Sequence, residues 1–335
     1  MTERRAVGKT DGKSKPVNAG ISRTKAPRVF LALAMTITAL LNAALAGDAE
    51  PTLSYELFPP RTPAAEDTLL ETMAVLAATR PDFMSITYGA SGTTRSTSRA
   101  VVHELALAHT IPPLAHLTCV DQSRADLIAV IETYLAEGVL DFLALRGDPP
   151  RGQADWRPHP DGLLYAYELV GLLREVAHAH GIDDMSVGVT AFPAQHAMER
   201  WRQQGLDVLR AKQDAGANFA ITQVFYDVEQ YSTLVSDARA QGITMAIVPE
   251  VMPLVSSRRA TRAQELTGVP TPAELFDALE AAETDDEARA AGVAHAARLS
   301  RELLDAGAPG IHIITFNRHE AALELVGAMG LRSGA

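Results

Sequence analysis

The chain has 335 residues, of which 47% are hydrophobic, so it is long enough to bury one large core. Its formal net charge of −11 argues against a nucleic-acid-binding surface. A single cysteine, Cys119, excludes both an internal disulfide and a cysteine-based metal site.

The first residues differ in charge from the rest of the chain. Residues 1–28 carry eight Lys/Arg and only two acidic residues. We expect residues 1–27 to form a disordered basic arm, and residues 28–335 to form a single catalytic domain.

An apolar run from Phe30 to Ala46 follows the basic stretch and has two interpretations. Basic residues, an apolar core and small residues at its end are the layout of a signal peptide, which would cover residues 1–46. Alternatively, the run is a helix that packs on the domain and ends at Gly47. It is short for a membrane span, and we expect no membrane partner.

Short apolar or β-branched runs then alternate with helical stretches along the rest of the chain. The predicted strands are Leu53–Phe58, Phe83–Tyr88, Leu114–Cys119, Phe142–Arg146, Ser186–Phe192, Phe219–Phe225, Met245–Val251 and Ile311–Phe316. The predicted helices between them include Ala64–Thr79, Arg124–Glu137, Leu163–His180 and Val228–Gln241. An insertion of one or two helices occupies Thr271–Ala306.

This alternation, without hairpin signals, predicts parallel strands. Eight strands favour a closed barrel over an open sheet. The predicted fold is therefore α/β, a (β/α)8 TIM barrel with an N-terminal helix and extra helices between strands seven and eight.

Catalytic groups in such barrels lie at the carboxyl ends of the strands, and polar residues recur at those ends here. Glu56, in the first strand, is foremost. Burial raises a carboxyl pKa, as a general acid near neutral pH requires. The alternative is a buried carboxylate paired with an arginine. His116, in the third strand, is either a ligand contact or a core histidine with satisfied hydrogen bonds.

After the fourth strand, Arg146 and Asp148 flank Gly147, which suits a tight turn where backbone approaches a ligand. The alternative is a surface ion pair, which would contribute little. No phosphate-binding glycine motif is present, and no group of residues has convincing metal-ligand spacing. The acidic run at 285–287 is more typical of a solvated helix start.

Six segments at or near the strand ends together resemble the methylenetetrahydrofolate reductase family. They are Ser54 to Pro60, Ser85 to Ala90, His116 to Thr118, Ala144 to Asp148, Asp214 to Gln223, and Asn317-Arg318. Asp155-Trp156, His159 to Gly162 and Pro249 to Pro253 are similar to an actinobacterial branch, of a bacterial type with no second domain after the barrel.

The resemblance implies reduction of 5,10-methylenetetrahydrofolate to 5-methyltetrahydrofolate, a step of one-carbon and methionine metabolism in the cytoplasm. NADH or NADPH would reduce a bound FAD, which would pass hydride to the folate. Glu56 would be the general acid that opens the folate ring, and Asp148 would tune flavin and pterin. Gln223, Arg318 and Thr87 would bind substrate. FAD would contact Thr87, Tyr88, Ala90, His116, Leu117, Arg146, Gly147, Asp148, Tyr165, Ala166, Phe192, His196 and Lys212.

The sequence also departs from the family pattern. Phe192 stands where tyrosine is common, and Gly205 and Ala211 replace an acidic and a basic residue that help Lys212 hold the FAD tail. Ser257, Arg259 and Ala263 replace phenylalanine, glutamine and phenylalanine at positions that grip nicotinamide or folate.

Three alternatives therefore stay open. The first is direct hydride transfer from NADH without flavin. The second is a non-redox lyase or aldolase, which would need a strand-end lysine for a Schiff base that none of the eight strands offers. The third is a binding protein without activity. The sequence leaves open the choice between NADH and NADPH and the presence of a homo-oligomer.

Overall fold

The computed structural model describes residues 35–87, 95–106, 111–148 and 157–331. Its centre is one sheet in which every recorded strand pair is parallel. The strands are β1 (Thr52–Leu57), β2 (Phe83–Ile86), β3 (Pro113–Thr118), β4 (Asp141–Leu145), β5 (Ser186–Ala191), β6 (Phe219–Thr222), β7 (Ala246–Val248), β8 (Glu250–Val251) and β9 (Gly310–Ile314). Each prediction of a strand is confirmed, with boundaries that differ by a few residues.

The seventh predicted strand is divided into β7 and β8 at Pro249. A proline has no N–H to donate to a strand ladder. β7 pairs with β6, whereas β8 pairs with β9, and the Pro249 carbonyl accepts a hydrogen bond of 3.0 Å from His312 N. This segment thus joins the two edges of the sheet, and the predicted (β/α)8 barrel is confirmed.

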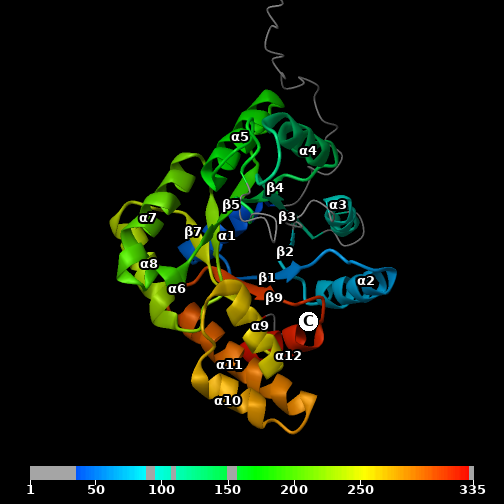
Figure 1. The fold of residues 1–335 in the computed structure, drawn as a ribbon, viewed down its shortest axis with the longest axis vertical. Helices are drawn as coiled ribbons and strands as arrows, with labels where there is room; N and C mark the ends of the chain where they lie inside the picture. The colour runs from blue at the N-terminus through cyan, green and yellow to red at the C-terminus, as the bar shows by residue number, and fades with distance from the viewer. Residues whose placement is uncertain (1–34, 88–94, 107–110, 149–156, 332–335) are drawn as a thin grey trace, which may run out of the picture.

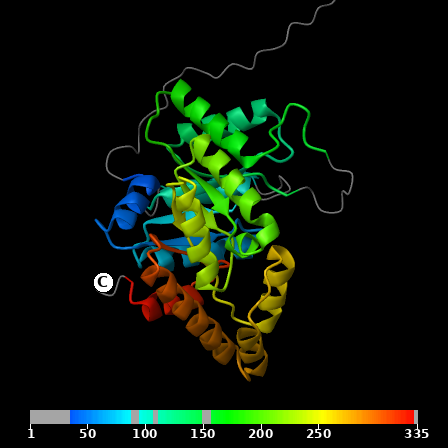
Figure 2. The ribbon, with the colours of Figure 1, turned by 90° about the vertical axis from the view of Figure 1, so that its left-hand side faces the viewer.

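Helices surround the sheet (Figure 1). They are α1 (Ile37–Ala46), α2 (Pro63–Ala77), α3 (Arg95–Glu104), α4 (Arg124–Ala136), α5 (Ala166–Ala179), α6 (Pro193–His196), α7 (Glu199–Asp214), α8 (Val228–Ala240), α9 (Ser257–Thr267), α10 (Ala273–Ala281), α11 (Asp285–Asp305) and α12 (Glu320–Met329). The predicted insertion is confirmed as α10 and α11, which project at one end of the molecule in both views (Figure 2).

Helix α1 closes the amino-terminal end of the barrel. Its Ile37 and Leu41 are fully buried, in one cluster with barrel-interior residues such as Phe83 and Phe219. Its first turn contacts the starts of β4 and β5, where Ile37 N donates to Asp141 and Thr38 N donates to Ser186. From residue 37 onward the prediction of a packed helix is confirmed, while the arm at 1–27 lies outside the described residues. No described helix has the length and apolar character needed to cross a bilayer.

Candidate active site at the barrel mouth

Four titratable side chains meet inside the barrel near the carboxyl ends of its strands. Glu56 Oε2 on β1 lies 3.8 Å from His116 Nε2 on β3 and 3.9 Å from His312 Nε2 on β9. Glu250, on β8, completes the group, because one carboxylate oxygen of Glu56, one of Glu250 and one His312 nitrogen all lie within 4.8 Å of one another. We call these four residues the acid–histidine cluster.

The cluster is almost completely enclosed. Glu56 is 9% exposed, Glu250 7%, His116 5% and His312 0%. No lysine or arginine of the described chain forms an ion pair with either carboxylate, so the alternative of Glu56 paired with an arginine is wrong. Two carboxyl groups therefore share a low-dielectric site with only histidines as possible cations.

Two serines fix the ring of His312. The Ser54 hydroxyl lies 2.8 Å from Nδ1 and the Ser85 hydroxyl lies 3.1 Å from Nε2. Glu56, Glu250 and His312 have the donor types of a divalent-cation site. However, both nitrogens of the His312 ring already face hydroxyl groups, so coordination of a cation would break one of these hydrogen bonds.

The two carboxyl groups differ in proton affinity. Burial raises the pKa of Glu56, but its contact with His312 and the charges of His116 and His312 lower this pKa further, to below its ordinary value. The expectation that burial sets a raised pKa at Glu56 is therefore wrong. Burial and the charge of Glu56 raise the pKa of Glu250 well above its ordinary value. Burial lowers the pKa of His116 to about 4, so His116 is neutral at neutral pH.

The turn after β4 has the geometry expected of Gly147. Its φ is 81°, and a Cβ there would lie 2.5 Å from Val120 Cγ1, so only glycine fits this position. Arg146 Nε donates to the Gly147 carbonyl. Arg146 and Asp148 are both exposed at the mouth and form no ion pair with each other, so the alternative of a surface ion pair is wrong.

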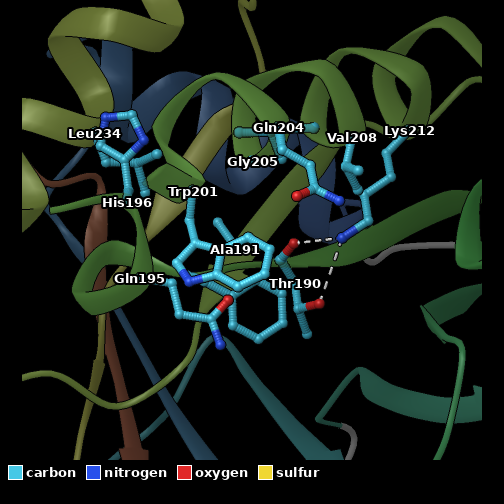
Figure 3. A pocket seen from close by; sticks show the side chains of 12 residues that line it. Thr190, Ala191, Gln195, His196, Trp201, Gln204, Gly205, Val208, Lys212 and Leu234 are labelled. Atoms are coloured by element: carbon cyan, nitrogen blue, oxygen red, sulfur yellow. Dashed lines mark hydrogen bonds between the residues drawn. The ribbon is translucent and has the colours of Figure 1, made fainter. Parts of the chain in front are cut away.

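A cavity of about 240 Å³ opens between the end of β5 and helices α6 to α8, and it brings together Phe192, His196 and Lys212. Figure 3 shows Lys212 pointing toward Thr190, whose carbonyl accepts a 2.7 Å hydrogen bond from its Nζ. Burial lowers the pKa of Lys212 to about 8. His196 Nε2 lies 3.0 Å from Asp237, while its buried Nδ1 has no hydrogen-bond partner among the described residues.

A second cavity, of about 290 Å³, lies beside the end of β9 and includes Arg259 and Arg318. The Arg259 guanidinium lies 4.9 Å from the centre of the Phe316 ring. Burial and the charge of Arg318 lower the pKa of Arg259. Within the described chain neither arginine forms an ion pair, although the acidic residues Asp285 and Glu320 also line this cavity.

The other predicted site residues are placed as follows. Thr87 and Gln223 lie just beyond β2 and β6, Tyr165 caps α5 with half its surface exposed, and Ala166 begins that helix. The Leu117 side chain is fully buried in the outer core, which leaves only its backbone for the predicted cofactor contact. Tyr88 and Ala90 lie outside the described residues.

Further residues at the site were not predicted from the sequence as site residues: Ser54, Ser85, Glu250, His312 and Asn317. The signal for His312 was available, because it is one polar residue within the apolar strand Ile311 to Ile314. Asn317 has a left-handed φ of 56° and its side chain exchanges two hydrogen bonds with the Phe58 backbone. Asn317 thereby ties the end of β9 to the end of β1, next to Glu56.

A (β/α)8 barrel with buried acids and histidines at the carboxyl ends of its strands defines an enzyme of the TIM-barrel class. Residues 40–330 match the family model described as methylenetetrahydrofolate reductase. The chain belongs to the methylenetetrahydrofolate reductase family, as its resemblance predicted, and it is an oxidoreductase. The alternative of a non-redox lyase or aldolase is therefore wrong.

Several relatives support this assignment. The chain is 34% identical to the 5,10-methylenetetrahydrofolate reductase of Salmonella typhimurium over 84% of this chain and 92% of the relative. Its identity to the Escherichia coli enzyme is 33%, with the same coverage. It is 32% identical to methylenetetrahydrofolate reductase (NADH) 1 of Arabidopsis thaliana, over 83% of this chain and 48% of that one.

A solved structure has the same fold. It is an uncharacterized protein from Clostridium thermocellum that binds two copies of 5-methyl-5,6,7,8-tetrahydrofolic acid, with a TM-score of 0.59 and 14% identity. The match covers 88% of this chain and 99% of that one. At this identity it supports the barrel fold alone.

Proposed function

We propose that the protein reduces 5,10-methylenetetrahydrofolate to 5-methyltetrahydrofolate in the cytoplasm, with NADH or NADPH as the hydride donor and FAD as the bound carrier. Family membership supports the folate reaction. The observation that carries the catalytic assignment is the burial of Glu56 among His116, His312 and Glu250 at the barrel mouth.

The reaction needs one proton and one hydride. The Glu56 carboxyl group donates the proton to the bridging nitrogen, N10, of the folate. The bond from N10 to the methylene carbon then breaks, and its electron pair stays on N10. This leaves an electrophilic iminium carbon that accepts the hydride. Enclosure of Glu56 keeps bulk water away from the proton.

The neighbouring residues bind and orient the substrate. Gln223 lies just beyond β6, one residue after Thr222, whose hydroxyl accepts from Glu250 N, and its amide suits the edge of the pterin ring. Arg318 lines the cavity beside β9 and forms no ion pair with a described residue, so its guanidinium suits the carboxylates of the folate tail. Asp148 lies at the mouth, after the Gly147 turn, where its charge would act on both ring systems.

The residues around the mouth fit a flat cofactor. Tyr165, Phe192 and Trp201 are 50%, 39% and 44% exposed, which is more than large aromatic side chains normally leave uncovered. The buried Nδ1 of His196, which has no hydrogen-bond partner among the described residues, offers a polar contact at the cavity edge. Thr87, His116, Arg146, Gly147, Ala166 and Lys212 would hold FAD together with these groups. When bound, FAD supplies hydride transfer between the nicotinamide and the folate.

One observation favours the alternative of direct transfer from NADH. The Lys212 ammonium group donates to the Thr190 carbonyl. Gly205, two turns earlier on the same helix α7, leaves the cavity wall without a side chain, with nothing within 4 Å of its Cβ position. The absorption spectrum of freshly purified protein separates the two. A flavin spectrum that NADH bleaches and the folate restores supports FAD. Colourless protein that still oxidises NADH with the folate supports direct transfer.

Replacement of Glu56 by glutamine tests the assigned reaction. Glu56→Gln keeps the side-chain size but carries no acidic proton, so folate reduction should fall by about 10²- to 10⁴-fold. Nicotinamide binding should remain, as should NADH oxidation by an artificial acceptor in flavin-loaded protein. Glu280→Gln, on the exposed face of α10, is the matched control. Equal loss of both activities, or no loss, would refute the role of Glu56.

A further inference from the structure

Glu250 has no part in the reaction as described so far, yet it points into the same site. It comes from β8, whose register pairs Glu250 with His312 of β9. On the other side of β9, Glu56 of β1 pairs with Ile314. The two carboxyl groups thus flank β9 and face each other above His312, with oxygens within 4.8 Å.

In the part of the chain that the structure describes, no lysine or arginine pairs with Glu250. Its backbone N donates to Thr222 Oγ1 at 2.9 Å. The titratable groups that face its carboxyl are Glu56 from β1 and His312 from β9, and His116 from β3 reaches Glu56 on the other side. A second negative charge at this distance from Glu56 is strongly unfavourable in an enclosed site, so the two carboxyl groups retain a proton between them.

We propose that Glu250 is the proton-holding partner of Glu56: the two carboxyl groups share one proton, which rests on Glu250 and passes to Glu56 for delivery to the folate. This inference rests on the proposed function, in which Glu56 is the general acid. Glu250 acts through Glu56 and is a positioning residue that controls where the proton lies.

The transfer balances as follows. The O–H bond of Glu250 breaks, its electron pair stays on that carboxylate, and an O–H bond forms on Glu56. Glu56 then gives the proton to N10, the hydride donor of the proposed function reduces the methylene carbon, and a solvent proton returns to the pair. No hydrogen bond between the two carboxyl groups is recorded, so the transfer needs rotation of one side chain or one intervening water.

The opposite order of proton affinity at the two sites agrees with this arrangement. The pKa of Glu56 lies below and that of Glu250 well above the ordinary value. A lone Glu56 with a lowered pKa would be ionised at neutral pH and would have no proton to donate. The neighbouring Glu250 resolves this, because the pair as a whole keeps one proton.

The pH dependence of Glu250→Gln tests the proposal. The variant removes the like charge that keeps the proton in the pair. The alkaline limb of kcat/KM for 5,10-methylenetetrahydrofolate should move to lower pH by about one to three units. At neutral pH the rate should fall by about tenfold or more, and mild acid should restore it to the wild-type plateau. Loss of activity by misfolding would not recover in acid.

Three companion variants make the outcomes distinguishable. Glu250→Asp keeps a carboxyl group, so the alkaline limb of its kcat/KM profile should lie at the same pH as in the wild type. Glu56→Gln should be inactive at every pH, with no recovery in acid, and Glu280→Gln should match the wild type. If Glu56→Gln stays active, the proposed function fails. If Glu56→Gln is inactive but the alkaline limb of kcat/KM in Glu250→Gln lies at the wild-type pH, only the inference about Glu250 fails.

A measurement on the wild-type protein completes the test. The infrared spectrum of the wild type at neutral pH should contain one carboxylic-acid carbonyl band that the spectrum of Glu250→Gln lacks. The difference between the two spectra isolates this band. This reading does not depend on turnover. A divalent metal bound one-to-one in the wild type and lost in Glu250→Gln, found by elemental analysis, would overturn the proposal, because a cation would then occupy the place of the proton.

Discussion

Asp141, at the opposite end of the barrel, provides a quantitative test of the packing of α1. It begins β4, is 8% exposed, and accepts a 3.4 Å hydrogen bond from Ile37 N at the start of α1. Burial, the largest influence, raises its pKa to about 6 from an ordinary 3.8, although contacts with Ser186 and the Ile37 backbone act in the other direction. Asp141→Asn replaces this acid with an amide of the same size.

The sign of the effect follows from the raised pKa. Between pH 3.8 and about 6 the folded protein binds the Asp141 proton and the unfolded chain does not, so stability falls as pH rises through this window. A pKa shift of about 2 units corresponds to about 3 kcal/mol of free energy of unfolding. Above pH 6 the folded protein is destabilised by this full amount. Asp141→Asn removes this cost. Relative to the wild type, it should therefore be about 3 kcal/mol more favourable at neutral pH than below pH 3.8, where the unfolded chain binds the proton too.

Urea denaturation at the two pH values measures this difference directly. The comparison cancels any constant cost of burying an amide, because that cost is the same at both pH values. Asp183→Asn, at an exposed position before β5, is the control and should show no such dependence. A difference between Asp141→Asn and wild type that does not change with pH would refute the reasoning.

Two further predictions concern the barrel's amino-terminal end and the cavity that contains Arg318. Leu41→Ala, in the buried face of α1, should lower the free energy of unfolding by about 2–5 kcal/mol, whereas the exposed Leu45→Ala should change it little. Equal effects in urea denaturation would contradict the burial of α1. Arg318→Gln should raise KM for the folate about tenfold with kcat unchanged, since it removes binding common to ground and transition states. The exposed Arg258→Gln is the control, and a fall in kcat alone in steady-state kinetics would contradict this role.

The barrel was predictable because its evidence is local. The spacing of apolar residues along the chain indicates where strands and helices alternate. Glu56 could be selected because it is a polar residue within the first such strand. His312 offers the same signal, but the sequence does not show which polar strand residues meet Glu56. Glu250 and His312 are 62 residues apart in sequence, and only the register of β8 against β9 brings them together. The raised pKa expected at Glu56 was wrong for the same reason, since long-range contacts with His312 and His116 outweigh burial.

The break at Pro249 connects the closure of the barrel to the chemistry at its mouth. Because Pro249 ends the pairing of β7 with β6, the next residue is free to pair with β9, and this pairing directs Glu250 toward Glu56. The inserted helices hold the segment that follows. Gly292 of α11 packs so closely that a Cβ would lie 1.6 Å from the Leu254 carbonyl oxygen, which leaves this backbone little room to shift. The insertion between β8 and β9 thus supports the strand that carries Glu250.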